Sequence, residues 1–217
     1  GLKSSYIALV EIQYRIFEKA MRLIISLLLT VIALGVSSQV EWVLEKDEEG
    51  IKVYTRKPEG SNFKEYKAEA IMHGTLDDFK DIVMNVEDYP DVYSNVETAM
   101  LLEASDTTLI YYMTTDVPWP VKDRDAIISV KLRRNAEEDL LEIFVNALPG
   151  YLEEKRGYVR IRKTQGKWNV KLLNDGTLKV HLRMHAEPSG SIPSWLVNRF
   201  IVDGPYEDFS NIREILK

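Results

Sequence analysis

The stretch from residue 191 to residue 217 constrains the fold most strongly, because its pattern predicts a long one-sided helix. Ser191 is a candidate N-cap, and Pro193 falls in the first turn, where its missing N–H removes no helical hydrogen bond. Apolar residues then recur at helical spacing. They form two groups: Ile192, Trp195, Leu196 and Phe200, then Tyr206, Phe209, Ile212 and Leu216.

The dipeptide Gly204-Pro205 separates these groups and is predicted to bend or break the helix, since proline cannot donate the hydrogen bond that continues it. A helix with one apolar side has to cover that side against another element, and the rest of the chain is rich in strands. We therefore expect the helix to lie on a sheet. Charged residues are predicted on its outer side: Glu207, Asp208, Arg213, Glu214 and Lys217.

The region before this helix is predicted to be mostly strand. Strands over 51–55 and 63–74 precede a helix that begins after Thr75, where Asp78 completes a capping box. Successive hairpins further along favour one curved antiparallel sheet. The predicted strands are 96–104, 108–115, 126–133, 140–147, 158–164, 167–173 and 177–186, with a turn at Gln165-Gly166.

Together these elements predict an α+β fold in which a curved antiparallel sheet wraps around the C-terminal helix. Both the sheet and the helix carry many apolar residues, and such an arrangement is rarely filled by side chains alone. We expect an enclosed apolar cavity between them. No linker or repeat interrupts residues 39–217, which are predicted to form one domain.

The first 38 residues differ from the rest. Met21-Arg22 precede an apolar run, 23–36, and the small residues Ser37-Ser38 follow it, which is the pattern of a signal peptide over 21–38. The alternative is a helix that stays buried or anchors the chain to a membrane. Residues 1–20 are expected to be an upstream extension, either untranslated sequence or an expression remnant. Export to the periplasm or the medium is the predicted localisation.

Composition excludes several functions. The net charge is −6, and residues 39–217 alone carry 24 basic and 32 acidic residues, a charge of −8, so no nucleic-acid partner is expected. The chain has no cysteine, which excludes thiol catalysis and thiolate metal sites. His181 and His185 lie too far apart on one strand to share a metal ion. No nucleophile or phosphate-loop motif is present, so we expect no cofactor and no metal.

Three stretches resemble the START family, the steroidogenic acute regulatory protein-related lipid transfer domains. The stretch 117–125 (VPWPVKDRD) is similar to a proline-rich turn that ends in Arg-Asp. The stretch 148–160 is similar to the family's mobile loop and the strand that leaves it, and 190–198 with Gly204-Pro205 is similar to its C-terminal helix. The resemblance spans about residues 40–217.

This resemblance implies a helix-grip fold that holds one lipid or other hydrophobic ligand, with the loop 147–157 as a lid and transient membrane contact at its tip. It implies a protein without catalytic residues that acts as a monomer. The ligand-binding residues expected on this basis are Tyr111, Met113, Trp119, Arg124, Leu148, Tyr151, Leu152, Trp168, Leu182, Met184, Trp195, Leu196 and Phe200.

The sequence departs from the family in one respect. Some sterol-binding members have an arginine in the cavity at the position of Val130, so their buried charge pair is absent here. Arg124 and Asp125 either contact a ligand or form a structural ion pair, and Trp119, Trp168 and Trp195 either contact a ligand or belong to the core. Two other functions stay open: a polyketide cyclase or hydrolase of the same superfamily, and a protein-interaction domain with a vestigial pocket.

Overall fold

The structure is a computed structural model that describes residues 13–15, 17–24, 41–190 and 192–217. The chain divides into two compact units, 1–39 and 40–217. In the first unit, 13–15 and 17–24 are helical, and Arg22 lies 2.7 Å from Glu18. Most of the predicted signal peptide lies outside the described residues, so its cleavage stays a prediction. Among the helices that are described, none is both long and apolar enough to cross a bilayer.

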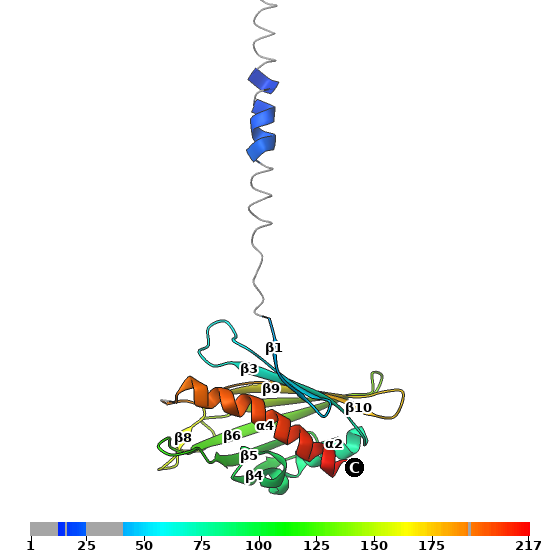
Figure 1. The fold of residues 1–217 in the computed structure, drawn as a ribbon, viewed down its shortest axis with the longest axis vertical. Helices are drawn as coiled ribbons and strands as arrows, with labels where there is room; N and C mark the ends of the chain where they lie inside the picture. Colours follow the sequence, from blue (N-terminus) through cyan, green and yellow to red (C-terminus); the bar gives the residue numbers. More distant parts are fainter. Residues whose placement is uncertain (1–12, 16, 25–40, 191) are drawn as a thin grey trace, which may run out of the picture. The chain divides into compact units, whose positions relative to one another are not determined.

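The second unit is an α+β domain, as predicted, in which long strands surround one long helix (Figure 1). In chain order its elements are β1 (Val43–Glu48), β2 (Ile51–Arg56), β3 (Glu65–Met72), α2 (Leu76–Met84), the 3-10 helix η1 (Val86–Asp88), α3 (Tyr89–Val92), β4 (Thr98–Ala104), β5 (Thr108–Thr115), β6 (Arg124–Asn135), β7 (Leu140–Ala147), β8 (Val159–Arg160), β9 (Lys163–Leu172), β10 (Leu178–Glu187) and α4 (Ser194–Ile215).

All strands belong to one 10-stranded sheet with the order β1-β2-β3-β10-β9-β7-β6-β5-β4, and β8 pairs with β6. Neighbouring strands are antiparallel except for the short parallel pair β6–β8. The last strand, β10, lies between β3 and β9, with Met72 of β3 opposite Leu178 of β10. The single antiparallel sheet predicted from the sequence is therefore confirmed.

Helix α2 begins where the capping box predicts. The Thr75 hydroxyl accepts a hydrogen bond from the Asp78 backbone N–H at 3.1 Å, and the Asp78 carboxylate accepts one from the Thr75 backbone N–H at 2.8 Å. Leu76, Phe79 and Val83 are buried on one side of this helix. The cap fixes the entry of α2, and the buried side holds it against the sheet.

The predicted turn at Gln165-Gly166 is wrong, because β9 runs through it from Lys163 to Leu172. Gly166 lies opposite Val145 of β7 and Met184 of β10. A Cβ at residue 166 would lie 2.5 Å from the Met184 sulfur, so glycine gives the Met184 side chain room to pack on the sheet. Of the predicted strand 158–164, residues 159–160 form β8 and residues 163–164 begin β9.

Helix α4 lies across one face of the sheet and contacts β1, β2, β3 and α3 (Figure 1). Gly204-Pro205 was predicted to bend or break this helix, and it does not break it, since Pro205 lies inside a continuous helix. Gly204 is buried, and a Cβ there would lie 2.4 Å from the Asn95 side chain, so this glycine permits a close approach. Pro193 is the N-cap, with no side-chain capping bond. The predicted cap Ser191 lies outside the described residues.

Aromatic packing joins both helices to the sheet. Trp168 on β9 is 4% exposed and lies between Phe79 of α2 and Phe209 of α4. Its ring stacks on Phe209 with centroids 5.5 Å apart and meets Phe79 edge-on at 5.6 Å. Trp168 therefore lies at the centre of the contact between α2, β9 and α4.

Candidate functional site

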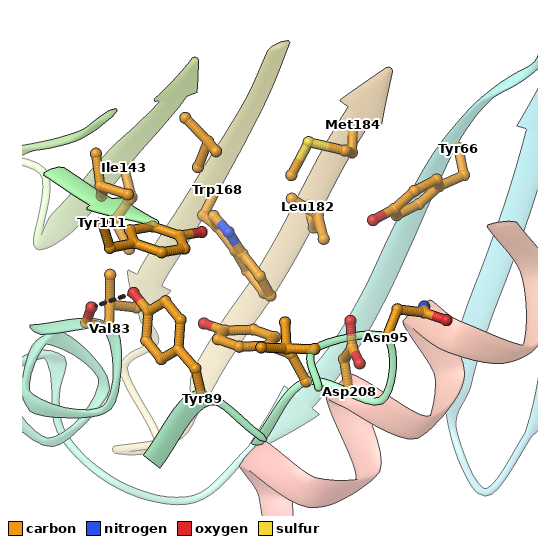
Figure 2. A pocket seen from close by; sticks show the side chains of 14 residues that line it. Tyr66, Val83, Tyr89, Asn95, Tyr111, Ile143, Trp168, Leu182, Met184 and Asp208 are labelled. Atoms are coloured by element: carbon orange, nitrogen blue, oxygen red, sulfur yellow. Dashed lines mark hydrogen bonds between the residues drawn. The ribbon is translucent and has the colours of Figure 1, made fainter. Parts of the chain in front are cut away.

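A cavity of about 170 Å³ lies between the sheet and the helices (Figure 2). Its walls come from β3, α2, α3, the segment 93–96, β5, β6, β7, β9, β10 and α4. Most of the lining is aliphatic or aromatic, as predicted for an apolar cavity. The lining residues are Tyr66, Val83, Tyr89, Tyr93, Asn95, Val96, Tyr111, Val130, Ile143, Val145, Trp168, Leu182, Met184 and Asp208.

The carboxylate of Asp208 is the one charged group in this lining. Asp208 was predicted on the outer side of α4, but it is buried at 9% exposure, which corrects that prediction. One of its oxygens, Oδ1, accepts hydrogen bonds from the Ser94 backbone N–H at 2.8 Å and the Ser94 hydroxyl at 2.9 Å. Burial raises the pKa of Asp208 to about 7, although the two Ser94 donors act against this shift.

Four tyrosines surround the same space. The Tyr89 hydroxyl donates to the Val83 carbonyl at 2.6 Å. The hydroxyls of Tyr66, Tyr93 and Tyr111 make no hydrogen bond within the described part of the chain. Burial raises the pKa of all four phenols well above the usual value, so they stay protonated near neutral pH. The cavity therefore offers hydroxyl groups beside one carboxylate.

Four of the predicted ligand-binding residues line this cavity: Tyr111, Trp168, Leu182 and Met184. Three other predicted residues do not line it. Met113 packs at the edge of the hydrophobic core, Leu196 is buried on α4, and Phe200 is half-buried on the same helix. The side chain of Trp195 lies outside what the structure describes.

Trp119 lies on the loop between β5 and β6 with 92% of its surface exposed. This corrects the expectation that it belongs to the core or the cavity wall, and the surrounding run of prolines explains the error, since such a loop extends away from the sheet. Arg124 is 3% exposed, and its guanidinium donates to the carbonyls of Lys122, Pro188 and Ser189. Arg124 thus joins two loops, and burial lowers its pKa.

The partner of Asp125 is Arg160 and not Arg124. The Arg160 guanidinium donates to both carboxylate oxygens of Asp125, at 2.9 and 2.8 Å, and both side chains are 1% exposed. Hydrogen bonding to Asp125 raises the pKa of Arg160. The remaining donors reach three carbonyls of the predicted lid, Pro149 at 3.0 Å, Leu152 at 3.0 Å and Glu153 at 3.1 Å. A buried ion pair therefore fixes the base of this loop.

The lid keeps apolar side chains at the surface. Leu148 is half-buried, whereas Tyr151 and Leu152 are 39% and 40% exposed. The Tyr151 hydroxyl donates to the Glu103 carboxylate on β4. The tip predicted from the sequence is thus exposed, while the role of the loop as a lid stays a prediction.

Sequence reasoning missed five polar residues that line the cavity. Spacing could have found Asp208, because it lies four residues before the buried Ile212 and four after the buried Gly204. The other four come from β3, α3 and the segment after it, and no local pattern marks them as cavity residues. The five are Tyr66, Tyr89, Tyr93, Asn95 and Asp208.

In the helix-grip class of proteins, a curved antiparallel sheet packs against a long C-terminal helix and leaves an apolar cavity between them. The domain has this arrangement. The START domain profile matches residues 25–217, and the chain belongs to this family.

Several relatives support this placement. An uncharacterised protein of Pseudomonas aeruginosa is 31% identical over 173 residues, which cover 80% of this chain and 85% of that protein. Mouse phosphatidylcholine transfer protein is 26% identical and covers 73% of this chain and 75% of its own length. The crystal structure of a STAR-related lipid transfer protein from Xanthomonas axonopodis superposes with a TM-score of 0.74 at 34% identity, covering 81% of this chain and 98% of that one.

The fold extends to more distant structures. Human StAR-related lipid transfer protein 5 gives a TM-score of 0.67 at 16% identity, with 92% and 97% of the two chains covered. This likeness shows the fold alone. The predicted helix-grip fold and the predicted family are both confirmed.

Proposed function

We propose that this protein binds one lipid or other hydrophobic ligand inside the cavity and carries it between membranes as a non-catalytic monomer. The observation that carries the proposal is the apolar cavity between the sheet, α2, α3 and α4 in a chain of the START family. Relatives named as lipid transfer proteins support it. Apolar walls supply affinity by removing hydrocarbon from water, and no covalent chemistry is needed.

The size of the cavity supports a gated mechanism. Its volume of about 170 Å³ is below the roughly 300–1,000 Å³ of small-molecule pockets, so a long-chain lipid enters only when the walls move apart. We propose that the loop 147–157 and the first turns of α4 move for this purpose. Exposed Tyr151 and Leu152 would then contact the bilayer while the ligand crosses.

Native mass spectrometry of the full chain, purified from its own host and from a lipid-rich extract, tests the proposal. The expected result is one co-purifying lipid class at one molecule per chain, identified after organic extraction. A chain that remains empty after exposure to phospholipids, sterols and long-chain alcohols contradicts it.

We also propose that the protein is exported, with residues 21–38 as the signal peptide. The sequence pattern described above supports this proposal. Fractionation of the native host, followed by N-terminal sequencing, tests it. A chain that begins at Gln39 outside the cytoplasm is the expected result, and an uncleaved chain in the cytoplasm contradicts it.

A further inference from the structure

The polar groups of the cavity gather around α4. Asp208 projects from α4 into the cavity with Asn95 beside it, and Tyr66 faces them from β3 (Figure 2). Burial, and to a smaller extent the charge of Asp208, raises the pKa of Tyr66 and of Tyr93, which line the same cavity. The site thus combines a buried acid with neutral hydroxyl groups.

Asp208 has hydrogen-bonding capacity left over. A carboxylate has about four acceptor positions, and both Ser94 donors use Oδ1. Within the described residues, no donor reaches the second oxygen, Oδ2. Asp208 is 9% exposed and lines the cavity, so an oxygen that receives no donor from the protein favours a ligand that supplies one.

The lining contains no compensating positive charge. Among the described residues of the cavity wall there is no lysine, arginine or histidine. The nearest charged neighbour that affects Asp208 is Glu207, on the exposed side of the same helix, and it is also acidic. A ligand carboxylate or phosphate beside Asp208 would therefore meet repulsion in a poorly solvated space.

We propose that this cavity takes a lipid whose polar end is uncharged and donates a hydrogen bond, a long-chain alcohol in chemical terms, with Asp208 as the acceptor, and that it rejects lipids with an anionic end. The inference rests on the proposed lipid-binding function and names the ligand class of the same cavity. Tyr66 and Tyr93 line the same cavity as Asp208, and their hydroxyls can bond the ligand oxygen in turn.

The test uses the full chain at pH 8.5 and three probes that share one alkyl chain: hexadecanol, hexadecanoate and hexadecylamine. Each displaces an environment-sensitive fluorescent probe from the wild type and from Asp208→Asn. Comparing the two proteins for each probe cancels differences in aqueous solubility. Glu207→Gln, which removes a charge one residue away but outside the cavity, is the matched control, and thermal melts confirm that each variant is folded.

In Asp208→Asn we expect the Kd of hexadecanoate to fall by about 10- to 30-fold. The wild type can bind the anion without repulsion once Asp208 is protonated. Because the pKa of Asp208 is about 7, protonation at pH 8.5 costs about 30-fold in affinity, which sets the upper limit of the change. The Kd of hexadecanol should rise about three- to tenfold, since a neutral amide is a weaker acceptor than a carboxylate. Glu207→Gln should leave both values within twofold.

Unchanged hexadecanoate affinity in Asp208→Asn overturns the inference, and so does an equal change in Glu207→Gln. If hexadecylamine loses at least tenfold more affinity than hexadecanol, Asp208 recognises a cation and the alcohol assignment is wrong. If the wild type binds none of the three probes, the inference fails. The proposed lipid-binding function fails only if native mass spectrometry also finds the chain empty after exposure to phospholipids, sterols and long-chain alcohols.

Discussion

Replacing Asp208 by Asn should stabilise the protein at alkaline pH and give no stabilisation at low pH. Asn has nearly the same shape, and its carbonyl oxygen can still accept from Ser94, but it cannot ionise. In the wild type, burial raises the pKa of Asp208 from 3.8 to about 7. Ionisation of this carboxyl therefore opposes folding.

The sign and size follow from linkage. Because the folded state binds this proton more tightly than the unfolded state, the favourable contribution is complete below pH 3.8 and is lost as the pH rises through 7. The shift corresponds to about 4 kcal/mol of unfolding free energy at pH 8. The buried amide N–H groups of Asn offset part of this gain, so we expect about 2–4 kcal/mol.

Urea unfolding of the wild type and of Asp208→Asn at pH 4 and pH 8 measures this effect. At pH 8 the variant should be more stable by about 2–4 kcal/mol, or roughly 5–15 °C in Tm for a domain of this size. At pH 4 the ionisation gain is almost absent, so the variant should be equal to the wild type or less stable by up to about 2 kcal/mol, the cost of the buried amide. Glu207→Gln should match the wild type at both pH values. A gain of equal size at both pH values, or no gain at pH 8, would refute the argument from burial.

Three further perturbations address the core, the lid and its base. Trp168→Ala should lower the unfolding free energy by about 3–5 kcal/mol, whereas exposed Trp119→Ala should change it by less than about 0.5 kcal/mol; equal effects would contradict their placement. Arg160→Met leaves Asp125 buried without its partner and should lower the unfolding free energy by about 3–5 kcal/mol, measured by urea unfolding. A variant as stable as the wild type would contradict this expectation. Leu152→Asp should slow ligand exchange with vesicles at an unchanged Tm, and unchanged exchange would exclude this loop as the lid.

Local patterns were sufficient for much of the fold. The bounds of β5 and β7 agree with the predicted strands, because their residues alternate between the core and the outer face and end at clear turns. The capping box at Thr75 located the start of α2. These features depend on neighbours in the sequence, which is why the sequence alone predicts them.

The errors occurred where distant residues decide the outcome. Gly166 was predicted in a turn, but it lies in a strand paired on both sides, and its missing Cβ leaves room for the Met184 side chain. Gly204-Pro205 was predicted to bend or break α4, but the helix continues through it, and the missing Cβ of Gly204 lets the Asn95 side chain of another segment approach closely. Asp208 was assigned to solvent as a charged residue, and its burial depends on Ser94 and the cavity. Such contacts form only in the folded domain, so a local pattern cannot reveal them.

The position of β10 in the middle of the sheet has a consequence for how the domain folds. Since β10 lies between β3 and β9, the early hairpins and the later meander each keep an open edge until nearly the whole chain is available. Closing this seam joins residues very far apart in the sequence, which slows folding relative to a meander of local hairpins. A chain that ends before residue 178 would expose the edges of β3 and β9 together, and unpaired edges of this kind favour aggregation.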